Sequence, residues 1–286
     1  MRLKAMPKQS PKKQTRLIVF TDLDATLLDE QNYDWEPARP ALESLEKKGA
    51  ALVLASSKTF PELLYFAKTL NTNSPFISEN GAVIAIPEIH KLSSHISDEC
   101  VRDGYKLIIN GVSRESIVDS IRTLRNNFGF RFKGFADWSP SEVQKLTGLS
   151  AKSSENALIR LATEPIVWLD TSAQLAIFER EIARWGIKAL RGGRFIHLMG
   201  QTDKANAMQQ LLGYYEASFP EIDFTTIALG DSHNDANMIA LADIGIVIPN
   251  PINTGTIAPH GQNIIHARHP GPIGWNAVMT DLLQSF

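Results

Sequence analysis

The stretch that decides the fold is LIVFTDLDAT, residues 17–26. Its first four residues, Leu17–Phe20, form an apolar run that is typical of a strand buried on both faces. Asp22 and Asp24 follow this run one residue apart. Two carboxylates so close together raise each other's pKa unless a cation or a shared proton relieves them. Packing alone does not explain such a pair, so we interpret it as a candidate reaction centre.

Further apolar runs and helical patterns alternate along both ends of the chain. The predicted strands are Ala51–Ala55, Val83–Ile86, Thr226–Leu229 and Gly245–Ile248. The predicted helices are Ala38–Lys48, Pro61–Leu70, Asp203–Leu212 and Asn234–Ala242. Near-continuous apolar strands that alternate with helices are typical of parallel sheets covered on both faces. The sequence therefore predicts an α/β fold with a doubly wound parallel sheet.

The middle of the chain has more turn signals and a different order of elements. Its predicted strands are Lys106–Ile109, Ile166–Leu169 and Phe195–Leu198, and its predicted helices are Arg114–Asn127, Ser141–Leu146 and Ala173–Trp185. We interpret this part as an α+β insertion. The expected organisation is a disordered basic tail at 1–14, a discontinuous core at 15–87 and 200–286, and an inserted domain at 88–199.

Composition limits the class of protein. Of the 286 residues, 43% are hydrophobic and 21% are charged, and the net charge is −2, which favours a globular domain and no nucleic-acid partner. The single cysteine, Cys100, cannot form an internal disulfide. No apolar run approaches the ~20 residues that span a membrane, so we expect a cytoplasmic protein without a membrane partner. The sequence leaves its oligomeric state open.

Polar clusters follow several predicted strands, where open α/β sheets bind ligands. The clusters comprise Asp22, Asp24 and Thr26; Ser56, Ser57, Lys58 and Thr59; Lys204; and Gly230 to Asp235. Hydroxyl groups and free backbone N–H groups at a helix start, as at Ser56 and Ser57, suit a phosphate. The carboxylates of Asp231 and Asp235 suit Mg²⁺, which prefers oxygen ligands.

These clusters, in this order, resemble the four motifs of the haloacid dehalogenase superfamily of phosphatases. The resemblance implies a Mg²⁺-dependent phosphatase with an α+β cap inserted after the second motif. Asp22 would attack phosphorus to form an aspartyl-phosphate, and Asp24 would act as general acid and base. Phosphate would be bound by Thr26, Ser56 or Ser57, and Lys204, and Mg²⁺ by Asp22, the Asp24 carbonyl, Asp231 and Asp235. Ala25 replaces the usual glycine, which costs backbone freedom if the turn needs a positive φ.

Within the superfamily, the predicted cap resembles that of mannosyl-3-phosphoglycerate phosphatases. The resemblance rests on Glu79-Asn80-Gly81, on 135–139 and on Arg191-Gly192-Gly193-Arg194-Phe195-Ile196-His197. It implies a phosphorylated small-molecule substrate bound by Glu79, Asn80, Arg160, Arg191, Gly192, Gly193 and Arg194. Guanidinium groups would suit the glycerate carboxylate. Two other enzymes stay open, a broad-specificity sugar-phosphate phosphatase and a phosphomutase, as does a non-catalytic phosphate-binding protein.

Overall fold

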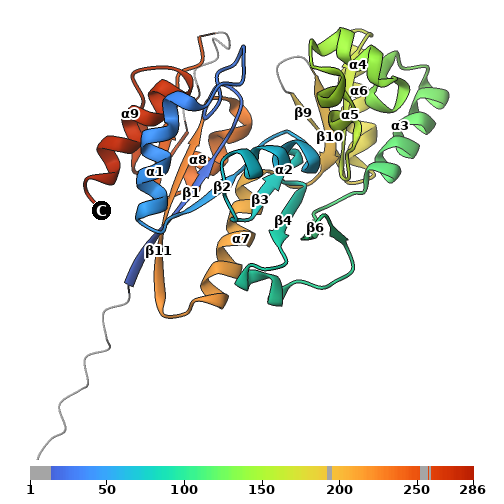
Figure 1. Cartoon of the computed structure of the whole chain (residues 1–286). Coiled ribbons are helices and arrows are strands. Elements are labelled where there is room, and N and C mark those ends of the chain that lie inside the picture. Colours follow the sequence, from blue (N-terminus) through green and yellow to red (C-terminus); the bar gives the residue numbers. More distant parts are fainter. Residues whose placement is uncertain (1–13, 192–194, 252–256, 258) are drawn as a thin grey trace, which may run out of the picture.

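The computed structural model describes residues 14–191, 195–251, 257 and 259–286. It has two lobes, one holding α1, α8 and α9 and the other holding α3 to α6 (Figure 1). The first lobe contains a parallel sheet in the order β13-β12-β11-β1-β2. Its strands are β1 (Gln14–Thr21), β2 (Ala51–Leu54), β11 (Ile222–Gly230), β12 (Ile244–Val247) and β13 (Ile264–His266). The predicted α/β class and its parallel sheet are confirmed.

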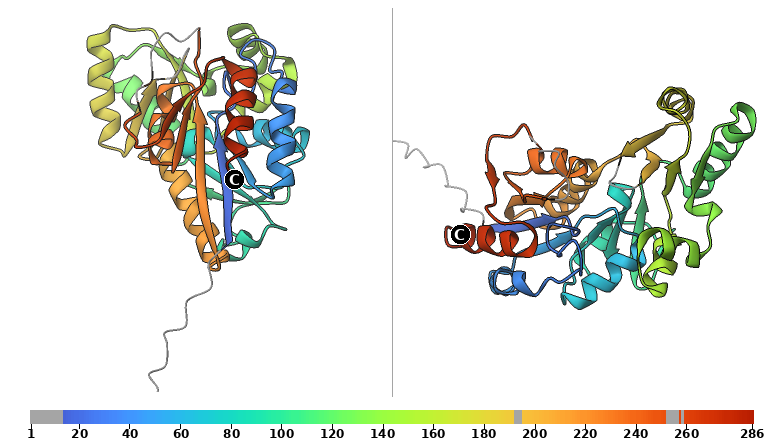
Figure 2. Two further views of the ribbon diagram at one scale, coloured as in Figure 1. Left: turned by 90° about the vertical axis from the view of Figure 1, so that its left-hand side faces the viewer. Right: turned by 90° about the horizontal axis from the view of Figure 1, so that it is seen from above.

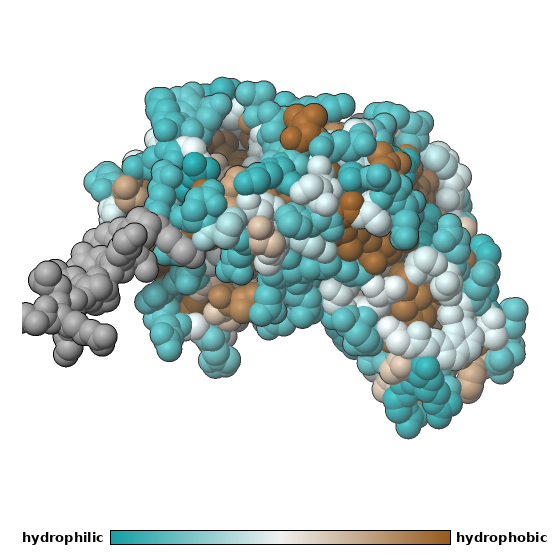
Figure 3. Space-filling view, turned by 90° about the horizontal axis from the view of Figure 1, so that it is seen from below, coloured by the Kyte–Doolittle hydropathy of each residue, from teal (hydrophilic) through white to brown (hydrophobic). Residues whose placement is uncertain are grey.

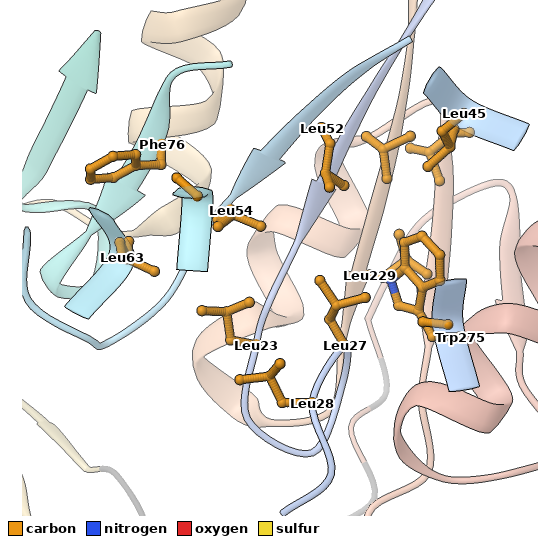
Figure 4. Close-up of a cluster of buried hydrophobic side chains, with 14 of the residues drawn as sticks. Leu23, Leu27, Leu28, Leu45, Leu52, Leu54, Leu63, Phe76, Leu229 and Trp275 are labelled. Carbon is orange, nitrogen blue, oxygen red and sulfur yellow. The ribbon is translucent and has the colours of Figure 1, made fainter. Parts of the chain in front are cut away.

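Helices cover both faces of this sheet, as the two-sided burial of β1 requires. Leu17 and Val19 pack in the same cluster as residues of α1 (Arg39–Lys47) and α9 (Gly271–Leu283), where Trp275 is fully buried (Figure 4). Ile18 and Phe20 pack against α7 (Lys204–Ser218) and α8 (Ala236–Leu241). Successive strand residues point to opposite faces, so one apolar run supplies both cores.

A second sheet corrects the prediction for Val83–Ile86. This segment forms β4 (Val83–Pro87), but it pairs antiparallel with β3 (Phe76–Ser78) and β6 (Tyr105–Ile109), which pairs with β5 (Val101–Arg102). A parallel bridge from Ala55 to Ile77 joins this sheet to the end of β2. Burial on both faces makes an antiparallel strand look like a parallel one in sequence. The helix α2 (Phe60–Thr69) connects β2 to β3.

The other lobe is built on an antiparallel sheet in the order β7-β8-β10-β9. Its strands are β7 (Phe132–Gly134), β8 (Thr163–Trp168), β9 (Ile187–Arg191) and β10 (Ile196–Gly200). One face packs on α3 (Arg114–Phe128) and α6 (Ser172–Ala183). The pair α4 (Pro140–Thr147) and α5 (Ala151–Leu158) lies apart from these helices, and α5 contacts α2 of the first lobe (Figure 2).

Several elements were not predicted from the sequence, among them the 13-residue helix α9 and the shorter elements α5, β7, β9 and β13. Short 3₁₀ turns lie at Glu36–Ala38, Glu79–Gly81, Lys91–His95, Phe135–Asp137 and His233–Asp235. Of the predicted tail, only residue 14 is described, and it begins β1. No helix in the described parts of the chain is long and apolar enough to cross a membrane. The face shown in Figure 3 is largely hydrophilic, and its hydrophobic residues (brown) lie in several separate groups.

Candidate active site

Strand register brings the predicted clusters to one edge of the parallel sheet. Thr21, the last residue of β1, pairs with Leu229 of β11 and with Leu54 of β2. The chain therefore leaves the same edge at Asp22, at Ser56 and at Asp231. Parallel strands have their carboxyl ends on one side, and this is the side where such sheets bind ligands.

Lys204 joins two of the acidic groups at this edge. It is the first residue of α7, it is fully buried, and its Nζ lies 2.5 Å from Oδ1 of both Asp22 and Asp235. Burial opposes the charge of Lys204, but attraction to the two carboxylates outweighs it and raises the pKa of the lysine. The ammonium group is therefore a fixed positive charge between two elements far apart in sequence.

Asp22, Asp231 and Asp235 form an acidic triad. Each offers a carboxylate oxygen, and these oxygens lie within 4.8 Å of one another. Burial raises the pKa of Asp22 well above its usual value, Lys204 opposes this shift, and the neighbouring carboxylates add to it. Burial and then Asp235 raise the pKa of Asp231 to about 7. Buried carboxylates that repel one another favour a bound cation, and oxygen donors fit Mg²⁺.

The members of the triad differ in how many of their oxygens are already bound. Asp235 gives one oxygen to Lys204, and the other accepts hydrogen bonds from Ser232 N (3.1 Å) and Ser232 Oγ (3.0 Å). Asp231 accepts from Thr26 Oγ1 (3.2 Å) and from Asn250 Nδ2 (2.6 Å). Both oxygens of Asp231 and of Asp235 thus accept hydrogen bonds, whereas the described contact of Asp22 is through Oδ1 to Lys204. The contacts of Asp235 orient Lys204 and the loop that carries Asp235.

Asp24 points to a different partner. Its Oδ1 lies 2.8 Å from Nζ of Lys58, which also lies over the ring of Tyr33 at 4.7 Å. Within the described residues the Asp24 carboxylate is outside the acidic triad. The metal contact predicted from its backbone carbonyl stays a prediction. Lys58 lies within the predicted phosphate cluster, but no role was predicted for this lysine.

The residues predicted to bind phosphate, Thr26, Ser56 and Ser57, have different partners in the structure. Thr26 is fully buried and its hydroxyl donates to Asp231. Ser56 follows β2, is almost fully buried, and its Oγ accepts from the N–H of Lys58 at 3.3 Å. The carbonyl of Ser57 instead faces Arg160, whose Nη1 is 3.5 Å away. Of the two serines, Ser56 is the more buried. It lies at the carboxyl edge of the parallel sheet, which we call the catalytic edge.

Ala25 adopts a backbone conformation that favours glycine. Its φ is +57°, a left-handed conformation, and its side chain is buried. For an L-residue this conformation costs about 1–2 kcal/mol. The chain therefore builds the Asp22–Thr26 turn with some backbone strain.

Glu79 and Asn80 contact other parts of the chain. The Glu79 carboxylate is fully buried and accepts hydrogen bonds from the segment 161–163. Asn80 Oδ1 accepts from Nδ2 of Asn234 at 3.0 Å. Both residues were predicted to bind substrate, which stays a prediction; in the structure their side chains link segments that surround the site.

Arg160 and His197 lie on the second lobe beside this edge. Nη1 of Arg160 donates to Thr163 Oγ1 at 2.8 Å, and its guanidinium lies 5.5 Å from the ring of Phe135. His197 projects from the face of the sheet opposite α3 and α6, since its neighbours Ile196 and Leu198 pack on those helices. Burial and then Arg160 lower the pKa of His197 to about 3. In the described residues, Arg160 Nε and His197 Nδ1 are buried without a hydrogen-bond partner.

The predicted arginine-glycine segment is only partly described. Arg191 ends β9 and lies 3.9 Å from the carboxylate of Glu179. Gly192, Gly193 and Arg194 lie outside the described residues. Three contact residues were not predicted to have a role: Lys58, Thr163 and Asn250. The sequence did contain a signal for Lys58, because a positive charge just before a helix is disfavoured by the helix dipole, but the partner of this lysine could not be predicted from the sequence.

The class of protein is defined by its fold and its site together. The doubly wound sheet carries a buried lysine and an acidic triad at its carboxyl edge, and a second α+β lobe lies beside them, an arrangement typical of a class of hydrolases. The chain belongs to the haloacid dehalogenase-like hydrolases, since the model of that family matches residues 19–254. The predicted superfamily and its enzymatic nature are therefore confirmed.

Relatives within this family indicate a particular kind of enzyme. A glucosyl-3-phosphoglycerate/mannosyl-3-phosphoglycerate phosphatase of Methanococcoides burtonii is 37% identical over 267 residues, which cover 93% of this chain and 97% of the relative. A protein of the same name from Persephonella marina is 36% identical and covers 94% and 97%. A solved Thermoplasma acidophilum structure matches with a TM-score of 0.64 at 19% identity, covering 96% of this chain and 100% of that one. This last likeness supports the fold.

Proposed function

We propose that this chain is a Mg²⁺-dependent phosphatase that converts mannosyl-3-phosphoglycerate to mannosylglycerate and phosphate. The observation that carries the proposal is the position of Lys204, 2.5 Å from both Asp22 and Asp235 at the edge that holds the acidic triad. The names of the two curated relatives support the substrate, and they also make the glucosyl compound a candidate.

The residues would divide the reaction between them. Asp22 would attack phosphorus and form an aspartyl-phosphate, and water would then hydrolyse it. Lys204 and Ser56 would bind phosphoryl oxygens, where charge develops in the transition state. Asp24 would protonate the leaving oxygen through its Oδ2, while Lys58 keeps the carboxyl group in place through Oδ1. Asp24 would later take a proton from the attacking water.

Mg²⁺ would be held by Asp22 and Asp231, together with the Asp24 carbonyl. When bound, it neutralises negative charge between the nucleophile and the phosphate. Asp235 would keep Lys204 and the 231–235 loop in place through the contacts described above. Thr26 and Asn250 would orient Asp231.

The proposal includes a division into a core and a cap. The predicted core comprises 15–87 and 200–286, and the predicted cap comprises 88–199. Pairing of β6 with β4 favours a first boundary nearer residue 110 than 88. The cap would bind the organic part of the substrate through Arg160, Arg191 and the segment 192–194, and a cytoplasmic location also belongs to this proposal.

A phosphate-release assay tests the function directly. The purified chain would be given mannosyl-3-phosphoglycerate, glucosyl-3-phosphoglycerate, simple sugar phosphates and 3-phosphoglycerate, with Mg²⁺ or with EDTA. We expect kcat/KM for a glycosyl-3-phosphoglycerate to exceed that of each simple phosphate at least about tenfold, which corresponds to about 1.4 kcal/mol. EDTA should abolish the activity, and added Mg²⁺ should restore it.

The nucleophile variant separates the alternatives. Asp22→Asn should remove almost all turnover without loss of the folded state, and more than a few per cent of residual activity would contradict the assignment. A preference below tenfold would favour a broad-specificity sugar-phosphate phosphatase. Transfer of phosphate within the substrate, without release, would favour a phosphomutase. Binding of the phosphorylated substrate without hydrolysis or phosphate transfer would favour a non-catalytic phosphate-binding protein.

A further inference from the structure

Glu79 is a buried carboxylate that the reaction proposed above does not use. It is fully buried and lies in a turn, Glu79–Gly81, whose three residues all have positive φ: +52°, +58° and +96°. Two of these three are not glycine. A left-handed backbone costs free energy for such residues, so the surrounding contacts must hold the turn in place.

The backbone of this turn contacts the catalytic edge. The N–H of Glu79 donates to the Lys58 carbonyl and the N–H of Asn80 donates to the Ser56 carbonyl, both at 2.9 Å. Asn80 also accepts from Asn234, which precedes Asp235. On its other side the turn packs closely on the start of α7, since a Cβ on Gly81 would lie 2.1 Å from the Asp203 carbonyl oxygen. The turn thus touches three of the four predicted motifs.

The side chain of Glu79 contacts the other lobe. Its Oε1 accepts from Leu161 N at 2.8 Å, and its Oε2 accepts from Ala162 N at 3.1 Å and from Thr163 Oγ1 at 2.7 Å. Two backbone amides and one hydroxyl therefore point at one carboxylate. Hydrogen bonds to an ionised acceptor are stronger than neutral ones.

The segment 161–163 is in turn part of the lobe that carries Arg160 and His197. Arg114 of α3 donates from its backbone N–H to the Leu161 carbonyl at 2.8 Å and from its side chain to Glu164 at 2.9 Å. Thr163 begins β8, which pairs with β10 and its His197. A shift of this segment would therefore move the whole sheet of the lobe and Arg160 with it.

We propose that Glu79 is a positioning residue that holds the cap segment 161–163 against the turn Glu79–Gly81. This turn itself contacts Ser56, Asn234 and the start of α7. The side chain of Glu79 binds the cap segment, and its backbone N–H donates to the Lys58 carbonyl beside the catalytic edge. The placement of the substrate's organic part over the phosphate site thus depends on one carboxylate. The catalytic consequence rests on the proposed function, whereas the docking contact does not.

Glu79→Gln tests this role, since it keeps the size of the side chain but places an NH₂ group against N–H donors. We expect kcat/KM for a glycosyl-3-phosphoglycerate to fall about tenfold or more, and that for p-nitrophenyl phosphate to fall about threefold or less. Hydrogen exchange should become faster at the amides of Leu161 and Ala162. The matched control is Glu88→Gln, at an exposed glutamate after β4, which should leave both quantities unchanged.

Equal losses on the two substrates, or unchanged exchange at Leu161 and Ala162, would overturn the proposal. If Glu79→Gln does not fold, Thr163→Val removes one of the three contacts and should speed hydrogen exchange at Leu161 and Ala162 by a smaller factor. Hydrogen exchange is the measurement to use for this variant, because Thr163 also accepts a hydrogen bond from Arg160. A wild-type chain that hydrolyses no glycosyl-3-phosphoglycerate would contradict the proposed function. In that case hydrogen exchange would still test the docking role of Glu79.

Discussion

Nζ of Lys58 lies 2.8 Å from Oδ1 of Asp24, and this ion pair holds the second aspartate of the pair away from the acidic triad. The lysine side chain is 10% exposed and that of the aspartate 39%. Burial opposes the lysine charge, but Asp24 and then Glu62 outweigh it and raise the pKa of Lys58. The two carboxylates of this pair therefore contact different lysines, Asp22 contacting Lys204 and Asp24 contacting Lys58.

Replacing Lys58 should affect the proton-transfer step most. Lys58→Met keeps an unbranched side chain but leaves Asp24 without its ionic partner. We expect kcat/KM, which reports the step that releases the leaving group, to fall about 10–100-fold for a sugar phosphate, whose leaving oxygen needs a proton. The decrease for p-nitrophenyl phosphate should be much smaller, because nitrophenolate leaves without one. Lys58→Arg should recover part of the loss, and identical losses on both substrates would argue against a role in holding Asp24.

Mg²⁺ should stabilise the chain more at high pH than at low pH. The pKa of Asp231 is raised to about 7, so charge on it is unfavourable in the folded metal-free state. The stability of that state therefore falls as pH rises from about 4 through 7. A cation that binds the ionised carboxylate removes this penalty. The increase in melting temperature on adding Mg²⁺ should be larger at pH 8 than at pH 6.

Asp231→Asn provides the control for the metal effect. It should abolish the Mg²⁺-dependent increase in melting temperature and raise the stability of the metal-free chain at pH 8. A Mg²⁺ effect of the same size at both pH values, or one that survives in Asp231→Asn, would show that the cation binds elsewhere.

Ala25→Gly should stabilise the chain, in contrast to most alanine-to-glycine changes. Ala25 has φ +57°, so glycine relieves strain that exceeds the entropy it adds to the unfolded chain. We expect the free energy of unfolding in urea to rise by about 0.5–1 kcal/mol. Ala82 is also buried but has φ −73°, so Ala82→Gly should lower it. A loss at both positions would mean that the turn is not strained.

His197 should make stability depend on pH in the acidic range. Its pKa is lowered to about 3 by burial and Arg160, whereas an unfolded histidine has a pKa of about 6.5. The unfolded state thus takes up a proton as pH falls below 6.5, and the stability is lost progressively toward pH 3. Between pH 7.5 and 5 the loss amounts to at most about 2 kcal/mol. His197→Gln should reduce this loss, whereas His95→Gln, at an exposed position, should not.

Local sequence was enough for β1, β2, β11 and β12 of the parallel sheet and for the candidate residues that follow three of these strands. Leu17–Phe20 is buried on both faces, and Asp22 and Asp231 follow strands whose carboxyl ends coincide. The pairing partner of Val83–Ile86 could not be derived in this way. A fully buried strand has the same apolar pattern in parallel and antiparallel sheets.

The class of fold and the superfamily could be predicted from the sequence, because they depend on local patterns of burial and on motif spacing. The partner of each charged side chain follows only from the tertiary structure. Lys204 reaches Asp22 across 182 positions, and Glu79 reaches Leu161 across 82. Such pairings depend on how separate elements pack, since a side chain's neighbours in space are set by the whole core and not by its own segment.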